Sequence, residues 1–528
     1  MTEPSDLGAS NGVNRRALLA GGVSLSATAY EGIALARSPD PLVVTRHGPV
    51  RGIRSDGLLV FRGIRYGADT GPQRFQPPSP PTPWRDPLPC LAYGHASPQR
   101  GKEPDQSEDC LFLNIWTPGA DAGRRAVMVY IHGGAYMTGS GSSPLYDGAA
   151  LATRGDVVVV TLNHRLGPFG YLYLNRLVAG FADGGNAGML DLVLALRWVR
   201  DNIARFGGDP SRVMLFGQSG GGAKIATLMA MPAAKGLFHR AATMSGQQLT
   251  ASGPGNATRR TVALLEALQA RPEALAGMPA GRIVEALGAV DPVIGSGSLY
   301  FGPVLDERSL TRHPFYPDAP PQSASVPMMI GNTRDETRGF FSDPAMYALT
   351  WEDLPGKLIP NMRVDIDPGV VIARYRALYP AYSPSDVFFA ATTASRSWRA
   401  AIVEAELRAA QGSPAFAYLL DWASPKDGGR WGAPHTLDIP LVFGTLRAEG
   451  SITGEGPEAR RVSGLMMDAF VRFARTGDPN GSGLPRWEPY SLARRQTMVW
   501  DVEPRLVDDP RGEERKLFEK VPFVQQGT

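Results

Sequence analysis

A serine flanked by glycines is the residue pattern with the clearest chemical potential in this chain. Gly217–Gly221 reads G-Q-S-G-G, a G-x-S-x-G pentapeptide centred on Ser219. The apolar run Val213–Phe216 precedes it, and Gly222–Met231 after it has the composition of a helix. A sharp strand-to-helix turn can hold a serine in a strained backbone conformation with its hydroxyl exposed. This context, more than the pentapeptide in a glycine-rich chain, predicts that Ser219 is a nucleophile.

A second glycine-rich segment lies upstream and could stabilise negative charge. His132–Ala135 reads H-G-G-A and follows the apolar run Ala126–Ile131. Acyl transfer forms an oxyanion, which preorganised backbone N–H groups stabilise where no bulky side chain keeps the backbone away. An oxyanion loop upstream of a serine elbow indicates an α/β-hydrolase.

The predicted nucleophile needs a histidine that removes its proton. In α/β-hydrolases the chain order is serine, acid, histidine, so the base must lie well downstream of Ser219. His239 is too close behind the predicted elbow helix, which leaves His313 and His435. His435 is favoured because it follows the apolar run Ala415–Leu420, whereas His313 lies in a polar stretch.

A carboxylate that orients this histidine should follow another strand between Ser219 and His435. The apolar run Val326–Ile330 is followed by two adjacent candidates, Asp335 and Glu336. Either carboxylate could fix the imidazole tautomer and stabilise the imidazolium, and their position alone does not choose between them.

Short apolar runs that alternate with helix-period segments must position these residues. The runs are rich in Val, Ile and Met and resemble strands buried on both faces, and Leu190–Phe206 is the clearest helix, ended by Gly207 and Gly208. This alternation predicts an α/β fold in which helices cover both faces of a large, mostly parallel sheet, with loop and helical insertions. No linker divides residues 37–528, which we expect to form one domain. The predicted strands are Ala126–Ile131, Val157–Leu162, Val213–Phe216, Val326–Ile330, Ala415–Leu420 and Thr497–Trp500.

The N-terminal segment is typical of a targeting signal. The pair Arg15–Arg16 precedes the small-residue stretch Ala17–Ala29, and an A-x-A pattern ends at Ala36. This predicts a twin-arginine export signal over residues 1–36 and a periplasmic or secreted enzyme. A cytoplasmic tail is the alternative, because Glu31 lies close to the cleavage site.

Composition limits the other classes of function. The chain has 54 basic and 51 acidic residues, a net charge of +3 and no block of like charges, which indicates a mixed solvated surface instead of a nucleic-acid patch. No apolar run of the mature chain reaches the roughly 18 residues that span a membrane. The cysteines and histidines lack the spacing of a metal site.

Several longer segments occur in the order typical of one family. Over roughly residues 42–505 the sequence resembles the type-B carboxylesterase/cholinesterase family. The resemblance implies an α/β-hydrolase that cleaves small-molecule carboxylic esters and requires no metal or organic cofactor. The segments that carry it are Arg74–Pro78, Ser107–Asn114, Asn163–Gly167, Gly185–Asp191, Phe206–Pro210 and Asp438–Phe443.

The resemblance also assigns roles to individual residues. It implies that Glu336 is the catalytic acid with Asp335 behind it, that His435 is the base, and that Ser245 supports the triad from behind. The implied oxyanion-hole donors are the backbone N–H groups of Gly134, Ala135 and Gly220.

The only two cysteines, Cys90 and Cys110, match the position of the family's disulfide. An exported enzyme would allow that bond to form. Two unpaired buried thiols are the alternative.

Three positions depart from the family's usual G-E-S-A-G elbow and D-E-G acid motif. Gln218 replaces the glutamate and removes a charge beneath the nucleophile, Gly220 replaces the alanine, and Thr337 replaces the glycine. None of these changes deletes a catalytic group, although Gln218 is expected to alter the hydrogen bonding behind the site.

Two other functions fit parts of this pattern. The same triad could cleave an amide, a carbamate or a lactone, because the acyl-transfer apparatus is shared. A catalytically inactive binding module is the other alternative, but such relatives typically lose the nucleophile. The natural ester cannot be read from loops that form the pocket walls. Apolar residues near the predicted site could line an acyl pocket or equally belong to the core; they are Tyr136, Met137 and the pairs Tyr300–Phe301 and Phe340–Phe341.

Overall fold

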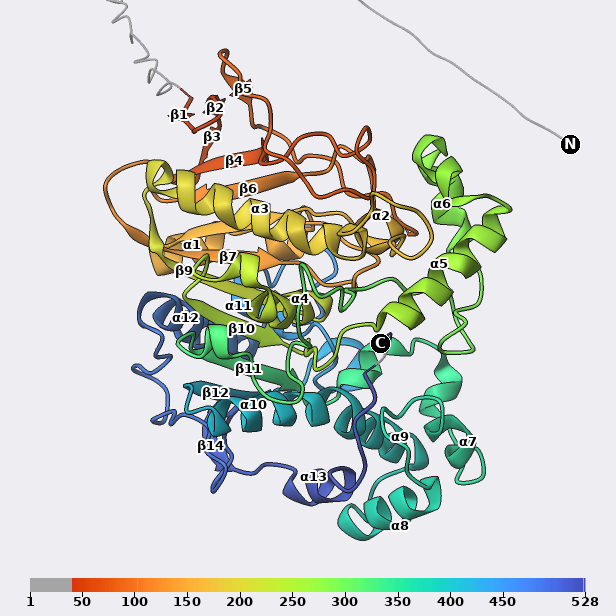
Figure 1. Ribbon diagram of the computed structural model, residues 1–528. Helices are drawn as coiled ribbons and strands as arrows, with labels where there is room; N and C mark the ends of the chain where they lie inside the picture. The colour runs from red at the N-terminus through yellow and green to blue at the C-terminus, as the bar shows by residue number, and fades with distance from the viewer. Residues whose placement is uncertain (1–39, 102, 526, 528) are drawn as a thin grey trace, which may run out of the picture. The chain divides into compact units, whose positions relative to one another are not determined.

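An eleven-stranded sheet organises the part of the chain that the computed structural model describes, residues 40–101, 103–525 and 527 (Figure 1). In the spatial order given next, the strands from β13 to β8 pair with their neighbours in parallel. At the two edges the pairing is antiparallel: β14 pairs with β13 at one edge, and β6, β4 and β3 follow β8 in antiparallel pairs at the other. In spatial order the strands are β14 (Arg505–Asp508), β13 (Gln496–Trp500), β12 (Ala415–Leu420), β11 (Met328–Thr333), β10 (Arg240–Met244), β9 (Gly208–Gln218), β7 (Arg125–Ile131), β8 (Val158–Leu162), β6 (Phe112–Thr117), β4 (Leu58–Arg65) and β3 (Ile53–Ser55). A small second sheet contains β1 (Leu42–Val44), β2 (Pro49–Arg51) and β5 (Leu88–Pro89).

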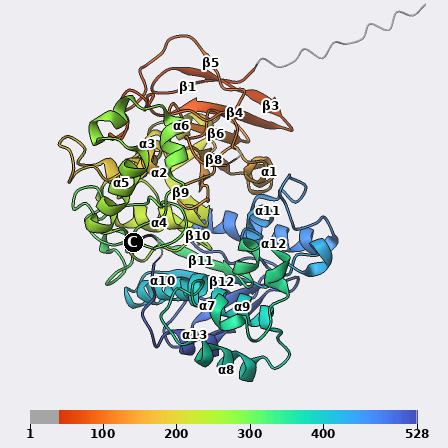
Figure 2. The same cartoon turned by 90° about the vertical axis from the view of Figure 1, so that its right-hand side faces the viewer.

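Helices cover both faces of the large sheet, as Figure 2 shows from the side. One layer contains α3 (Ala187–Asn202), α4 (Gly220–Ala230) and α10 (Arg399–Ala410), and the other contains α1 (Ala149–Gly155), α11 (Asp438–Phe443) and α12 (Pro457–Thr476). The remaining α-helices are α2 (Gly167–Tyr171), α5 (Pro254–Leu268), α6 (Ala280–Ala286), α7 (Leu354–Leu358), α8 (Pro368–Leu378), α9 (Pro384–Thr393) and α13 (Gly512–Phe518).

The central strands are apolar on both faces because each face has its own core. In β7, Val127 and Val129 pack into the core beneath α3 and α4, whereas Met128 and Tyr130 pack into the core beneath α11 and α12. Successive strand residues point to opposite faces, so a strand between two helix layers must be apolar throughout. The predicted fold class, with a mostly parallel sheet covered on both faces, is confirmed.

A third apolar cluster lies apart from the sheet. It joins α7, α8, α9 and α13 through buried residues such as Leu354, Phe388 and Phe518. From this cluster α9 runs through a π-helical turn, Ala394–Trp398, into α10 on the sheet. The turn therefore connects the insertion to the main fold.

The two cysteines are free thiols, which corrects the predicted disulfide. The sulfurs have different neighbours: Cys90 Sγ lies 4.0 Å from the carbonyl oxygen of Gly63, whereas Cys110 lies near the Arg165–Asp191 ion pair. Burial raises the pKa of the Cys90 thiol to about 12 and raises that of Cys110 as well. Both sulfurs are therefore protonated core groups, the alternative that the sequence left open.

The predicted export signal, residues 1–36, lies outside the described residues. Among the residues that are described, no helix is both long and apolar enough to cross a membrane. The domain start at residue 37 stays a prediction.

Candidate active site

Ser219 occupies a strained turn between β9 and α4. Its backbone dihedrals are φ 57° and ψ −126°, a region that non-glycine residues rarely adopt. The Ser219 amide donates a 2.7 Å hydrogen bond to the carbonyl of Met244 at the end of β10. A Cβ on Gly221 would lie 1.9 Å from the carbonyl oxygen of Ile131, so only glycine fits there. The elbow that the pentapeptide predicted is therefore present, with the glycine that its close packing demands.

Glu336 and His435 meet beyond the end of β11. His435 Nδ1 lies 2.5 Å from Glu336 Oε2. The other carboxylate oxygen accepts hydrogen bonds from the Thr333 amide at 2.8 Å and from Asn332 Nδ2 at 3.2 Å. Burial would raise the pKa of the Glu336 carboxyl, but His435 and these donors outweigh it and hold the pKa below its ordinary value. Glu336 is thus an ionised acceptor that orients the imidazole.

Asp335, the neighbouring candidate, holds the histidine loop from outside. Its carboxylate accepts a 2.9 Å hydrogen bond from the Ala433 amide, and its own amide donates to the Ala433 carbonyl at 2.8 Å. His313 accepts a hydrogen bond from the Ala251 amide at 3.1 Å and lies outside this cluster. The structure therefore brings Glu336 and His435 together, and leaves Asp335 in a supporting position.

Gln218 occupies the space beside the imidazole. Its Nε2 lies 3.1 Å from His435 Nε2 and 3.4 Å from Nδ1, so the amide lies over the ring. Among the described residues no hydrogen bond joins the Ser219 hydroxyl to His435, and in ligand-free enzymes such contacts are often long. The ring of Phe340 lies 4.6 Å from the imidazole, between centroids. The departure at position 218 thus places a neutral amide against the predicted base.

Two of the three predicted oxyanion donors border the same cavity as Ser219. Ala135 and Gly220 line it, whereas Gly134 does not, and none of the three amides donates a hydrogen bond to a described residue. A Cβ on Gly220 would lie 2.1 Å from the Ala135 carbonyl oxygen. The loop and the helix are therefore in contact, which explains why glycine stands at position 220.

Lys224, which was not singled out in the sequence, ties this loop to α4. Its buried Nζ donates hydrogen bonds to the carbonyls of Ala135 at 2.7 Å and His132 at 3.0 Å, and lies 5.4 Å from the centre of the Tyr136 ring. Burial lowers the pKa of Lys224 to about 7. The sequence signal is a lysine inside the otherwise apolar segment Gly220–Ala230.

Ser245 lies at the end of β10, with its amide donating a 2.7 Å hydrogen bond to the Gly331 carbonyl. Its φ is 51°, another strained conformation. The buried hydroxyl has no well-aligned partner, but it lies close enough to Glu336 to help lower the pKa of that carboxyl. This position is consistent with support of the triad from behind.

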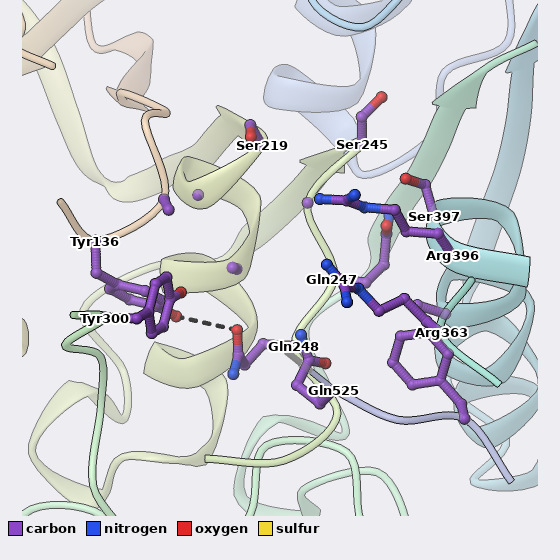
Figure 3. Close-up of a pocket in the computed structure, with 16 residues that line it drawn as sticks. Tyr136, Ser219, Ser245, Gln247, Gln248, Tyr300, Arg363, Arg396, Ser397 and Gln525 are labelled. Atoms are coloured by element: carbon purple, nitrogen blue, oxygen red, sulfur yellow. Dashed lines mark hydrogen bonds between the residues drawn. The ribbon is translucent and has the colours of Figure 1, made fainter. Parts of the chain in front are cut away.

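A cavity of about 160 Å³ opens in front of Ser219 (Figure 3). Tyr136 and Tyr300 line it, as the sequence suggested, and the Tyr136 hydroxyl donates to Gln248 Oε1 at 3.4 Å. Much of the wall is polar, which differs from the apolar acyl site that the sequence left open as one possibility. The polar wall residues include Gln247, Gln248, Arg363, Arg396, Ser397 and Gln525.

Comparisons with known proteins decide the family. The model of the carboxylesterase family matches residues 39–350 and 385–518. The chain belongs to the carboxylesterase family. The esterase is 36% identical over 503 residues to the para-nitrobenzyl esterase of Bacillus subtilis, a match that covers 90% of this chain and 98% of the relative. It is 35% identical over 474 residues to the phenmedipham hydrolase of Pseudarthrobacter oxydans, covering 85% and 93%.

Solved structures give the same result for the fold. A carboxylesterase of Geobacillus stearothermophilus superposes with a TM-score of 0.81 at 36% identity, covering 90% of this chain and 99% of the other. The protein is therefore an α/β-hydrolase that hydrolyses carboxylic esters. Residues 351–384, between the two matched parts, contain α7, α8 and Arg363.

Proposed function

We propose that the esterase hydrolyses small-molecule carboxylic esters through an acyl-enzyme on Ser219, with His435 as the base and Glu336 as the orienting acid. The observation that carries the proposal is the 2.5 Å contact between His435 Nδ1 and the buried Glu336 carboxylate, at the strand ends from which the strained Ser219 projects. With Nδ1 facing Glu336, Nε2, which also contacts the Gln218 amide at 3.1 Å, is the nitrogen that serves Ser219.

The reaction follows from these placements. His435 Nε2 takes the proton from Ser219 Oγ as this oxygen attacks the ester carbonyl carbon. The amides of Ala135 and Gly220, with that of Gly134, stabilise the oxyanion. The intermediate collapses, the alcohol takes the proton from Nε2 and leaves, and a water molecule that His435 deprotonates then releases the acid and restores the serine.

Ser219→Ala tests this assignment directly. We expect loss of at least about 10⁴-fold in kcat on a short-chain nitrophenyl ester, since the nucleophile is removed and the fold is not. A serine-directed phosphonate should label the wild type stoichiometrically at Ser219. Ser55→Ala, in the half-buried edge strand β3, is the matched control. Normal turnover by Ser219→Ala contradicts the proposal.

A second candidate reaction is carbamate hydrolysis. One relative is named for the hydrolysis of phenmedipham, and the same nucleophile, base and oxyanion donors serve carbamates and esters. Turnover of a matched ester, carbamate and amide with one alcohol or amine part separates these activities. A carbamate rate above the ester rate would make carbamate hydrolysis the primary function.

We further propose that residues 1–36 direct twin-arginine export, so that the mature enzyme acts outside the cytoplasm. Support comes from the Arg15–Arg16 pair and the A-x-A pattern at Ala36. Replacing both arginines by lysine should leave esterase activity in the cytoplasmic fraction, whereas the wild-type chain delivers it to the periplasm or medium. Equal distribution of the two contradicts this location.

A further inference from the structure

Two arginines border the cavity on the side facing Ser219. Arg396 projects from the π-helical turn Ala394–Trp398, and Arg363 comes from the segment between α7 and α8. Figure 3 shows both side chains reaching toward the space in front of Ser219 from the same wall. Local π-helical geometry in proteins occurs frequently at functional sites.

The charge of Arg396 is not neutralised within the described part of the chain. No described carboxylate lies within ion-pair distance of its guanidinium, and no aspartate or glutamate is among the described residues that line the cavity. The group lies 4.7 Å above the ring of Phe340. Glu336 attracts it, but that carboxylate is already held by His435.

The two guanidinium groups also disfavour each other. Burial, and then the charge of Arg396, lower the pKa of Arg363 to about 10, and burial lowers the pKa of Arg396 as well. Both groups nevertheless stay protonated near neutral pH.

We propose that the esterase's natural substrates carry a carboxylate in the acyl part, which binds Arg396 with the help of Arg363. Arginine pairs with carboxylates through parallel N–H···O bonds, a geometry that gives specificity as well as attraction. The inference rests on the proposed function of Ser219 and names the substrate class of that site.

The acyl part is the side of the ester that fits this cavity. The leaving alcohol must take its proton from His435, so the alcohol lies on the His435 side. The cavity is lined by Ser219, Ala135 and Gly220, and His435 is not one of its lining residues. The acyl chain, which stays on Ser219 after the alcohol leaves, is therefore the part that extends toward the arginines.

The volume and the surroundings restrict the acid further. A cavity of about 160 Å³ is close to the size that accepts benzene, so it suits a short chain. Half-esters of short dicarboxylic acids fit this description. Gln218 adds to the match, because the neutral amide beside His435 does not repel an anionic acyl group as a carboxylate would.

The test compares charged and neutral acyl groups of equal length. The substrates are the monoethyl esters of succinate, glutarate and adipate against ethyl butanoate, pentanoate and hexanoate, with ethanol release as the readout. We expect the best half-ester to exceed its neutral partner in kcat/KM by about 10- to 100-fold, a preference that falls as salt is added. A neutral ester preferred at every length overturns the proposal.

Variants assign the preference to Arg396. Arg396→Gln should lower the ratio of charged to neutral kcat/KM by about 10-fold or more, and Arg396→Lys should restore part of it, because the charge returns without the planar fork. Arg363→Gln should act in the same direction. Arg46→Gln, which removes an exposed arginine paired with Asp201, is the matched control and should leave the ratio unchanged.

The outcomes separate this inference from the proposed function. If no ester of either class is hydrolysed and the phosphonate does not label Ser219, the proposed function fails. If both classes are hydrolysed through Ser219 but the ratio is the same in wild type and Arg396→Gln, only the acyl-carboxylate inference fails. Circular dichroism of each variant shows whether it is folded.

Discussion

On the Ser219 side of the cavity, charged groups have partners within the chain, whereas on the opposite side no carboxylate of the described residues pairs with Arg396. Glu336 is held by His435, and the Lys224 ammonium donates to two backbone carbonyls. Elsewhere in the fold, Arg165, which is almost completely buried, is paired with Asp191 at 2.6 Å. The contrast supports the two proposals above. The groups at the strand ends around Ser219, Glu336 and His435, called here the reaction side, are held in fixed positions. The wall that contains Arg363 and Arg396, called here the helical wall, keeps a charge that a substrate can bind.

The largest effect should come from the catalytic acid. Glu336→Gln removes the charge that stabilises the imidazolium, and we expect kcat to fall by about 10³- to 10⁴-fold. Charged and neutral esters should lose activity equally, because Glu336 belongs to the reaction side. Asp335→Asn keeps an oxygen acceptor for the Ala433 amide and should cost no more than about 10-fold. A loss confined to charged esters contradicts this division of roles.

Replacing Arg165 and Arg396 in turn should distinguish an arginine that stabilises the fold from one that binds a ligand. Arg165→Met leaves Asp191 buried without its partner, so the free energy of unfolding should fall by about 3–5 kcal/mol. Arg396→Met leaves no carboxylate unpaired and should change it by less than about 1 kcal/mol. Urea unfolding of both variants measures the difference. Equal losses would mean that Arg396 is a structural residue.

The lysine beneath the oxyanion loop should affect every substrate to the same degree. Lys224→Met removes the two hydrogen bonds that hold the loop, and we expect kcat to fall by about 10- to 100-fold for charged and neutral esters alike. Lys235→Met, just beyond the end of the same helix, is an exposed control. An unchanged kcat in Lys224→Met means that the loop keeps its geometry without the clamp.

A smaller effect, on the pH dependence of stability, should come from Glu404, which lies behind the cavity residue Gln248. Burial raises the pKa of Glu404 to about 8, and this carboxyl accepts a 2.9 Å hydrogen bond from the amide of Gln248, a cavity residue. A carboxyl whose pKa is raised on folding binds more protons in the folded state, so stability falls as pH rises from its unfolded pKa toward 8. Between pH 5 and 8 the Glu404→Gln variant should gain about 1–3 kcal/mol relative to the wild type. Parallel curves for the two proteins in urea unfolding exclude this role for Glu404.

The reaction side was largely predictable because each part follows a buried strand. Apolar runs precede Ser219, the oxyanion loop and Glu336, and parallel strands bring their carboxyl ends to one edge of the sheet. The resemblance chose Glu336 over Asp335, which the position alone could not do. The structure adds the reason: only the Glu336 carboxylate is aimed at the imidazole, whereas that of Asp335 is aimed at the Ala433 amide.

The wall that contains Arg363 and Arg396 could not be predicted in the same way. An arginine in a helical segment is ordinarily solvated, and the charge of Arg396 becomes significant only because a π-helical turn points it into a cavity whose described lining residues include no carboxylate. Arg363 belongs to a segment that the family model does not match. The predicted disulfide is absent for a related reason: chain position does not determine whether the sulfurs of Cys90 and Cys110 meet, and both are free thiols.

The wall cations also have a consequence for the pace of turnover. A half-ester enters with one negative charge, but the acid that leaves Ser219 has two, the second formed beside the amides of Ala135 and Gly220. The same guanidinium groups therefore hold the departing molecule more tightly than the arriving one. On its preferred esters the enzyme should be limited by release of the acid, so that added salt weakens kcat/KM while it raises kcat.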